Sequence, residues 1–183
     1  MVENLSDPVA RLDRESRILY INPVVANITG LLPEHFIGKT SRELEIRFVR
    51  YILDLTEHLF DIYNVNSGTI KLNLDVDNIY LALETAISCG LIINELVTNA
   101  LKYVFPDRGK GEIEVKFYCD INEKMTLIVR DNGIGIPDKF DINTASSLGM
   151  TLVQGLVEQL EGSLELDRSQ GTEFRITFPG NVA

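Results

Sequence analysis

Hydrophobic and polar residues recur along the chain with two periods, and the changes of period divide it into predicted strands and helices. A period near two predicts strands at 9–21 (two short strands around a polar turn at 13–16), 69–76, 79–83, 112–118, 125–131, 163–168 and 172–178. A helical period predicts helices at 45–63, 86–104 and 148–160. Between the first strands and the first helix, only short helical or irregular pieces are expected.

The order of these elements indicates the fold class. Strands and helices are interleaved, but 112–118 and 125–131 follow one another closely, as do 163–168 and 172–178. Such neighbours form hairpins, so the pattern predicts an α+β domain with a mixed or antiparallel sheet and its helices on one face.

The predicted helix 86–104 carries polar residues that are unusual for a buried helix. At the helical rotation per residue, these polar side chains share an arc of about 140° opposite an apolar stripe; they are Asn94, Glu95, Thr98, Asn99 and Lys102. A solvated helix face is the simplest explanation. Asparagine, however, is a poor helix former, so two of them on one face indicate that oxygen acceptors are needed there. Glu95 and Asn99, one turn apart, can offer oxygens to a shared hard cation or to its waters.

Net charge and apolar content limit the classes of partner. The chain has 183 residues, 45% of them hydrophobic, and a formal net charge of −10, which argues against a nucleic-acid or anionic-membrane surface. Neither a signal peptide nor an apolar run long enough to span a membrane is present in the sequence, so we expect a cytoplasmic protein. Cys89 and Cys119 lie in apolar segments without metal-site spacing and are expected to be reduced core residues.

Three further segments are weak signals when each is taken alone. DNGIGIP (131–137) follows a predicted strand and contains an ordinary turn sequence. SSLGMTLV (146–153) opens a helix after small residues, which is compatible with an anion site at the helix start or with a plain serine cap. GTEFRITF (171–178) is a glycine followed by a strand.

Together and in this order, NELVTNALKY (94–103) and these three segments resemble the nucleotide-binding motifs of the GHKL ATPases, the group that includes gyrase, a heat-shock chaperone, histidine kinases and MutL. The sequence is most similar to the catalytic domain of sensor histidine kinases of the HWE-like type. The resemblance implies a two-layer α/β sandwich of the GHKL (Bergerat) type over residues 45–183, binding ATP and Mg²⁺.

The resemblance also implies roles on the phosphate side of such a site. Asn99 would coordinate Mg²⁺, Glu95 would hold or polarise a water beside it, and Lys102 would contact phosphate. Glu95 and Asn99 would thus be the catalytic pair. The start of the helix beneath the phosphates would be formed by Ser147, Gly149 and Met150. The chain departs from the longer family pattern here, since its second glycine-rich segment keeps only Gly149.

On the adenine side, the resemblance implies that Asp131 accepts a hydrogen bond from the 6-amino group. Gly133 and Gly135 would let the backbone pass close to the base. Thr172 would reach the adenine side through water.

The N-terminal residues 1–44 resemble the first part of a PAS sensory domain that stops near Leu44. Kinases of this family phosphorylate a histidine on a two-helix dimerisation hairpin, followed by a basic residue and asparagine. His35 and His58 both lack that context. The chain therefore resembles a sensor kinase from which the rest of the PAS domain and the hairpin are missing.

The leading interpretation is the ATP-binding catalytic domain of a two-component sensor histidine kinase, transferring the γ-phosphoryl group to a histidine not present in this chain. Two alternatives stay open: a protein serine kinase similar to the anti-sigma factors, and a non-catalytic nucleotide-dependent interaction module. The expected partners are a response regulator or other acceptor protein and a second copy of the chain, since residues 9–44 carry more apolar side chains than so short a piece can bury.

Overall fold

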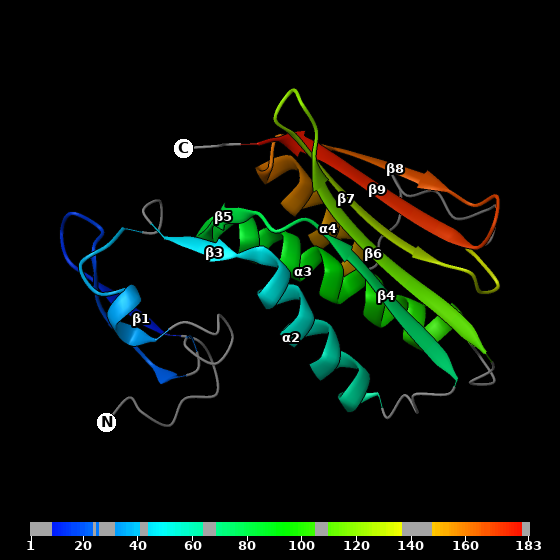
Figure 1. The fold of residues 1–183 in the computed structure, drawn as a ribbon, viewed down its shortest axis with the longest axis horizontal. Helices are drawn as coiled ribbons and strands as arrows, with labels where there is room; N and C mark the ends of the chain where they lie inside the picture. The colour runs from blue at the N-terminus through cyan, green and yellow to red at the C-terminus, as the bar shows by residue number, and fades with distance from the viewer. Residues whose placement is uncertain are drawn as a thin grey trace.

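The computed structural model describes residues 9–23, 25, 32–40, 44–63, 69–104, 110–136 and 148–180. Its main sheet has five strands in the order β4-β6-β7-β9-β8. Helices α2, α3 and α4 lie together on one face of this sheet (Figure 1). The strands are β4 (Ile70–Val76), β6 (Gly111–Cys119), β7 (Lys124–Asp131), β8 (Ser163–Asp167) and β9 (Thr172–Pro179). The helices are α2 (Phe48–Ile62), α3 (Leu83–Asn99) and α4 (Leu148–Gln159).

The strand pairing confirms the predicted mixed, mostly antiparallel sheet. β4 runs parallel to β6, and every other neighbouring pair is antiparallel. Alternate residues of β6 and β9 are buried, as expected for strands with one face against the helices. Phe117 of β6 packs between Phe48 of α2 and Phe178 of β9, with ring centroids 4.4 Å and 6.3 Å away.

The prediction of one helix over 45–63 is wrong for its first three residues. They form β3 (Glu45–Arg47), which pairs antiparallel with β5 (Tyr80–Ala82), and the helix begins only at Phe48. The pairing partner lies more than thirty residues further along the chain, so a local period could not reveal it. The Phe48 amide continues the connection by donating to the carbonyl of Ile79 at 3.0 Å.

The second predicted helix also differs from the structure at its end. α3 stops at Asn99 and continues as a π-helical turn, η3 (Ala100–Val104). Thr98, predicted on the polar arc, is buried, although Ile87 and Leu91 on the same face of α3 are exposed. The apolar side of α3 joins the main core as predicted.

The two cysteines differ in their environments. Cys89, a residue of α3, is buried in the main hydrophobic core, and this burial raises the pKa of its thiol. Cys119 ends β6, is only half-buried, and packs against the main core without being enclosed by it. Both are free thiols. None of the helices in the described part of the chain is long and apolar enough to cross a bilayer.

The N-terminal piece forms the predicted hairpin, β1 (Ala10–Leu12) and β2 (Ile18–Ile21), and a 3-10 turn, η1 (Pro33–His35). A small core is packed against Leu83, the first residue of α3; its members are Ile18, Ile21, Phe36 and Leu44. Other large apolar side chains of this piece stay exposed, namely Leu12, Leu19, Leu32 and Ile37. The domain boundary at residue 44 stays a prediction.

These exposed apolar side chains are the reason for predicting that two copies of the chain form a homodimer. We expect the full chain to be dimeric at micromolar concentration in light scattering, and a chain lacking residues 1–44 to be monomeric, because the second copy would cover this apolar surface. Leu19→Glu should also give a monomer. Ile121→Glu, at an equally apolar but isolated turn position that is 98% exposed, is the matched control. A monomeric full chain, or a deletion variant that stays dimeric, would show the prediction to be wrong.

Candidate functional site

A cavity of about 970 Å³ opens where four segments of the fold meet. Its walls come from the end of α3 with η3, the end of β7 with the loop after it, the start of α4, and the turn between β8 and β9. These segments lie far apart in the sequence. They include all four motifs that the sequence analysis singled out.

Glu95 and Asn99 line the cavity from the last turns of α3. The amide nitrogen of Asn99 donates a hydrogen bond of 2.9 Å to Oε1 of Glu95, which leaves the amide oxygen of Asn99 for another partner. The Glu95 carboxylate lies against Gly149 in the first turn of α4, and a Cβ at that position would overlap it. The glycine therefore permits a carboxylate and a helix start to share one wall of the cavity.

Lys102 also lines the cavity, from the π-helical turn. Successive π-helical residues rotate less than α-helical residues, because their hydrogen bonds span five residues instead of four. Lys102 is consequently turned further from Asn99 than an α-helix would place it. Its side chain is exposed, and it makes no ion pair with another of the described residues.

Asp131, the last residue of β7, also lines the cavity. Its carboxylate is buried and accepts a hydrogen bond of 3.0 Å from the Gly133 amide. Burial raises its pKa above the ordinary value for aspartate, while the hydrogen bonds from Gly133 and Thr172 act in the opposite direction. A buried carboxylate has little water to hydrogen-bond with, so it is suited to accept a hydrogen bond from a donor group of a ligand.

The turn before β9 supplies the wall beside Asp131. Gly171 has φ +94°, and any Cβ there would overlap the carbonyl oxygen of Asp131, so this position requires glycine. Gly135 has φ +74°, and a Cβ there would make a tight contact of 3.2 Å with the Gly171 carbonyl oxygen. Thr172 pairs with Asp131 across the two strands. Its buried hydroxyl makes no well-formed hydrogen bond with the described residues, although it lies close enough to favour the ionised carboxylate.

The structure brings most of the predicted site residues to this one cavity. Its lining includes Glu95, Asn99, Lys102, Asp131, Gly135, Gly149, Met150 and Thr172. Gly133 is not part of the lining and acts on it only through its hydrogen bond to Asp131. Ser147 lies outside the described residues.

Sequence reasoning missed part of the lining. Arg130 and Arg168 reach the cavity next to Asp131 and Thr172, in a chain whose net charge is strongly negative. Gly171 was noted only as the residue before a strand. Its position after Gln170 in a two-strand hairpin was a signal for a positive φ, but the approach to Asp131 depends on the pairing of β7 with β9.

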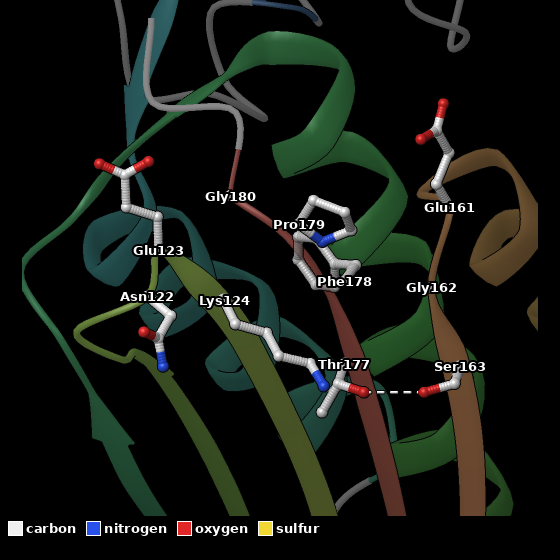
Figure 2. A pocket seen from close by; sticks show the side chains of 10 residues that line it. All are labelled: Asn122, Glu123, Lys124, Glu161, Gly162, Ser163, Thr177, Phe178, Pro179 and Gly180. Atoms are coloured by element: carbon white, nitrogen blue, oxygen red, sulfur yellow. Dashed lines mark hydrogen bonds between the residues drawn. The ribbon is translucent and has the colours of Figure 1, made fainter.

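A second hollow, of about 620 Å³, lies at the opposite end of the same strands. Figure 2 shows Lys124 at the start of β7 and the hydrogen bond between the hydroxyls of Ser163 and Thr177, 2.8 Å long. None of the predicted site residues lies there. Within the described ranges, no group of three or more His, Cys, Asp or Glu side chains is arranged to hold a metal ion.

Comparison with known proteins assigns the family. The model described as histidine kinase-, DNA gyrase B-, and HSP90-like ATPase matches residues 84–182, more than half of the chain, and a PAS fold model matches residues 2–51. The chain therefore belongs to the family of histidine kinase-, DNA gyrase B- and HSP90-like ATPases. Its ATPase domain is of the sensor histidine kinase type and follows a PAS-fold segment.

Its relatives include sensor kinases of two bacteria. Blue-light-activated histidine kinase 2 of Erythrobacter litoralis is 34% identical over 113 residues, which are 61% of this chain and 33% of that protein. The sensor histidine kinase PdtaS of Mycobacterium tuberculosis is 30% identical over 114 residues, 60% of this chain and 23% of that protein. The chain thus matches a third or less of the length of these relatives.

Solved structures confirm the predicted fold. The histidine kinase domain of the Erythrobacter litoralis EL346 blue-light activated histidine kinase has a TM-score of 0.68 and 31% identity, over 74% of this chain and 62% of that one. The mycobacterial sensor histidine kinase MprB, at 21% identity, shows the same fold with a TM-score of 0.60 over 75% of this chain and 97% of that one.

The residues of the cavity fit the ATP that the family binds. The buried Thr172 hydroxyl and the Asp131 carboxylate offer polar atoms to a base, and the glycines at 135 and 171 leave room beside them. The Asn99 amide oxygen and the Lys102 ammonium also line the cavity. The same cavity thus offers hydrogen-bonding atoms for a base together with an oxygen ligand and a cation for a phosphate chain.

Proposed function

We propose that this chain is the catalytic part of a two-component sensor histidine kinase and transfers the γ-phosphoryl group of Mg-ATP to a histidine outside the chain. The observation that carries the proposal is the single cavity that joins the Glu95–Asn99 pair to Asp131 and Thr172. The family assignment supports the nucleotide, and the sensor kinases among the relatives support the reaction.

When bound, Mg-ATP supplies the transferable phosphoryl group and the cation that neutralises its charge, so the protein contributes positioning and electrostatics. The Asn99 amide oxygen would ligate Mg²⁺, and Glu95 would orient a water of the ion. One or two side chains suffice, because Mg²⁺ in such sites keeps several waters and uses the phosphates as ligands. Lys102 would place positive charge beside the phosphates.

The remaining site residues would select and hold the nucleotide. Asp131 would accept a hydrogen bond from the adenine amino group, with Thr172 acting beside it through water. Gly133 and Gly135 would keep the loop backbone close to the base. The start of α4 would face the phosphates with the backbone amides of its first turn; its predicted members are Ser147, Gly149 and Met150.

The acceptor is proposed to lie in another protein segment. His58 is exposed on α2 and His35 is exposed in η1. Neither is followed by the basic residue and asparagine of the family pattern. A response regulator would receive the phosphoryl group in the next step.

Labelling with γ-phosphate-labelled ATP tests the proposal. We expect no label on the chain alone and acid-labile label on a separate dimerisation hairpin from a related sensor kinase when Mg²⁺ is present, since phosphohistidine is acid-labile. His58→Ala and His35→Ala should transfer as well as the original chain. Acid-stable label would instead favour a serine kinase, and ATP binding without any transfer would favour a nucleotide-dependent interaction module.

A further inference from the structure

Tyr63 is the residue at which α2 ends. It follows the last residue of α2, and its amide donates to the carbonyl of Leu59 at 3.1 Å. Leu59 is buried in the main core. The backbone that carries the Tyr63 ring is therefore fixed by the packing of α2 against the rest of the domain.

The ring of Tyr63 faces the ammonium group of Lys102. The Lys102 Nζ lies over the ring, 5.8 Å from its centroid, which is within the range of a cation–π interaction. The same Lys102 lines the cavity. The Tyr63 ring is thus a contact that the described residues make with a cation of the candidate site. Lys102 belongs to the π-helical turn that follows α3, so the contact joins this turn to the end of α2.

We infer that Tyr63 is a positioning residue for the phosphate group of the nucleotide, acting through Lys102. The inference rests on the proposed function, in which Lys102 contacts phosphate. Tyr63 does not touch the nucleotide itself. It restricts the lysine side chain to the mouth of the cavity before the ligand arrives.

The choice of an aromatic partner has a physical reason. A carboxylate beside Lys102 would neutralise the ammonium and compete with phosphate for its N–H donors. A ring face attracts the cation through its quadrupole and leaves the charge and most of the N–H donors available. Holding a flexible lysine in place also lowers the entropy that it loses when phosphate binds.

Nucleotide binding by four forms of the full chain tests this inference: the original chain, Tyr63→Leu, Tyr63→Phe and Lys102→Met. Calorimetry with Mg-ATP and with adenosine separates phosphate contacts from base contacts. We expect Tyr63→Leu to weaken Mg-ATP binding about two- to fivefold and to leave adenosine binding unchanged. Tyr63→Phe, which keeps a ring, should bind both ligands as the original chain does.

The double variant Tyr63→Leu/Lys102→Met should bind Mg-ATP no more weakly than Lys102→Met alone, because the ring acts only through the lysine. Tyr80→Leu, at an exposed tyrosine of β5, is the matched control and should have no effect. Weaker adenosine binding in Tyr63→Leu, or a further loss in the double variant, would overturn the inference, as would a Lys102→Met variant with unchanged Mg-ATP affinity. Failure of the original chain to bind Mg-ATP would instead contradict the proposed function.

Discussion

Replacing Asn99 by alanine should abolish phosphoryl transfer while the domain stays folded. The side chain lies at the end of α3, half-buried, and contributes no apolar surface to the core. Its removal takes away the proposed Mg²⁺ ligand and the hydrogen bond that orients Glu95. We expect the transfer rate to fall by at least about 100-fold, the size found when one charge-stabilising group is lost from a preorganised site.

Two measurements show whether the loss arises at the metal. In the original chain, Mg²⁺ should strengthen ATP binding relative to the same titration with a chelator. In Asn99→Ala this difference should disappear. Asn94→Ala is the matched control, since Asn94 is a half-buried asparagine of the same helix that does not line the cavity. If Asn99→Ala unfolds at the temperature typical of a core variant, Asn99 is structural and the proposed role is wrong.

The second large effect is expected at Asp131. Asp131→Asn should weaken ATP binding about 10- to 100-fold, because an accepting oxygen becomes a donor that faces the adenine amino group. The preference for ATP over GTP should shrink as well. Asp75→Asn makes the same chemical change at an exposed position of β4 and should bind ATP normally. Equal affinity of the original chain for ATP and GTP would contradict the assignment of Asp131.

The raised pKa of Asp131 gives this prediction a pH dependence. Because burial raises the pKa, the carboxylate becomes protonated at a higher pH than an ordinary aspartate, and binding of adenosine should weaken as the pH falls through that value. Asp131→Asn should lack this component. The pH dependence of folding stability has the opposite direction. Because the folded protein favours the protonated form of Asp131, ionisation of this carboxyl at neutral pH lowers the free energy of unfolding. Asp131→Asn should therefore not lower the melting temperature.

Local pattern was sufficient to predict the five strands of the main sheet, and in β6 and β9 the alternation follows directly from one buried sheet face. The hairpins β6–β7 and β8–β9 were predicted with their turns, and so was the helical layer. β3 was missed because its partner β5 is distant in sequence, and a short strand leading into a helix contributes no period of its own. The π-helical turn was missed because a hydrogen-bond pattern leaves little trace in hydrophobic spacing.

The site was predictable to a similar extent. Asn99, Glu95 and Asp131 could be identified by motif order, and the structure places them in one cavity. The contact between the Glu95 carboxylate and Gly149 could not be predicted, because it depends on how α4 approaches α3. The same holds for Gly171 beneath Asp131 and for Tyr63 beside Lys102, which meet only through tertiary packing.

α3 has a further consequence for how the two parts of the chain influence each other. Its first residue, Leu83, packs on the small N-terminal core, and its last residue, Asn99, lies in the cavity. Seventeen helical residues make a rod about 24 Å long. If α3 moves as one rigid body, a tilt or shift imposed on Leu83 would displace Asn99 as well, because one continuous helix without a loop joins the two residues.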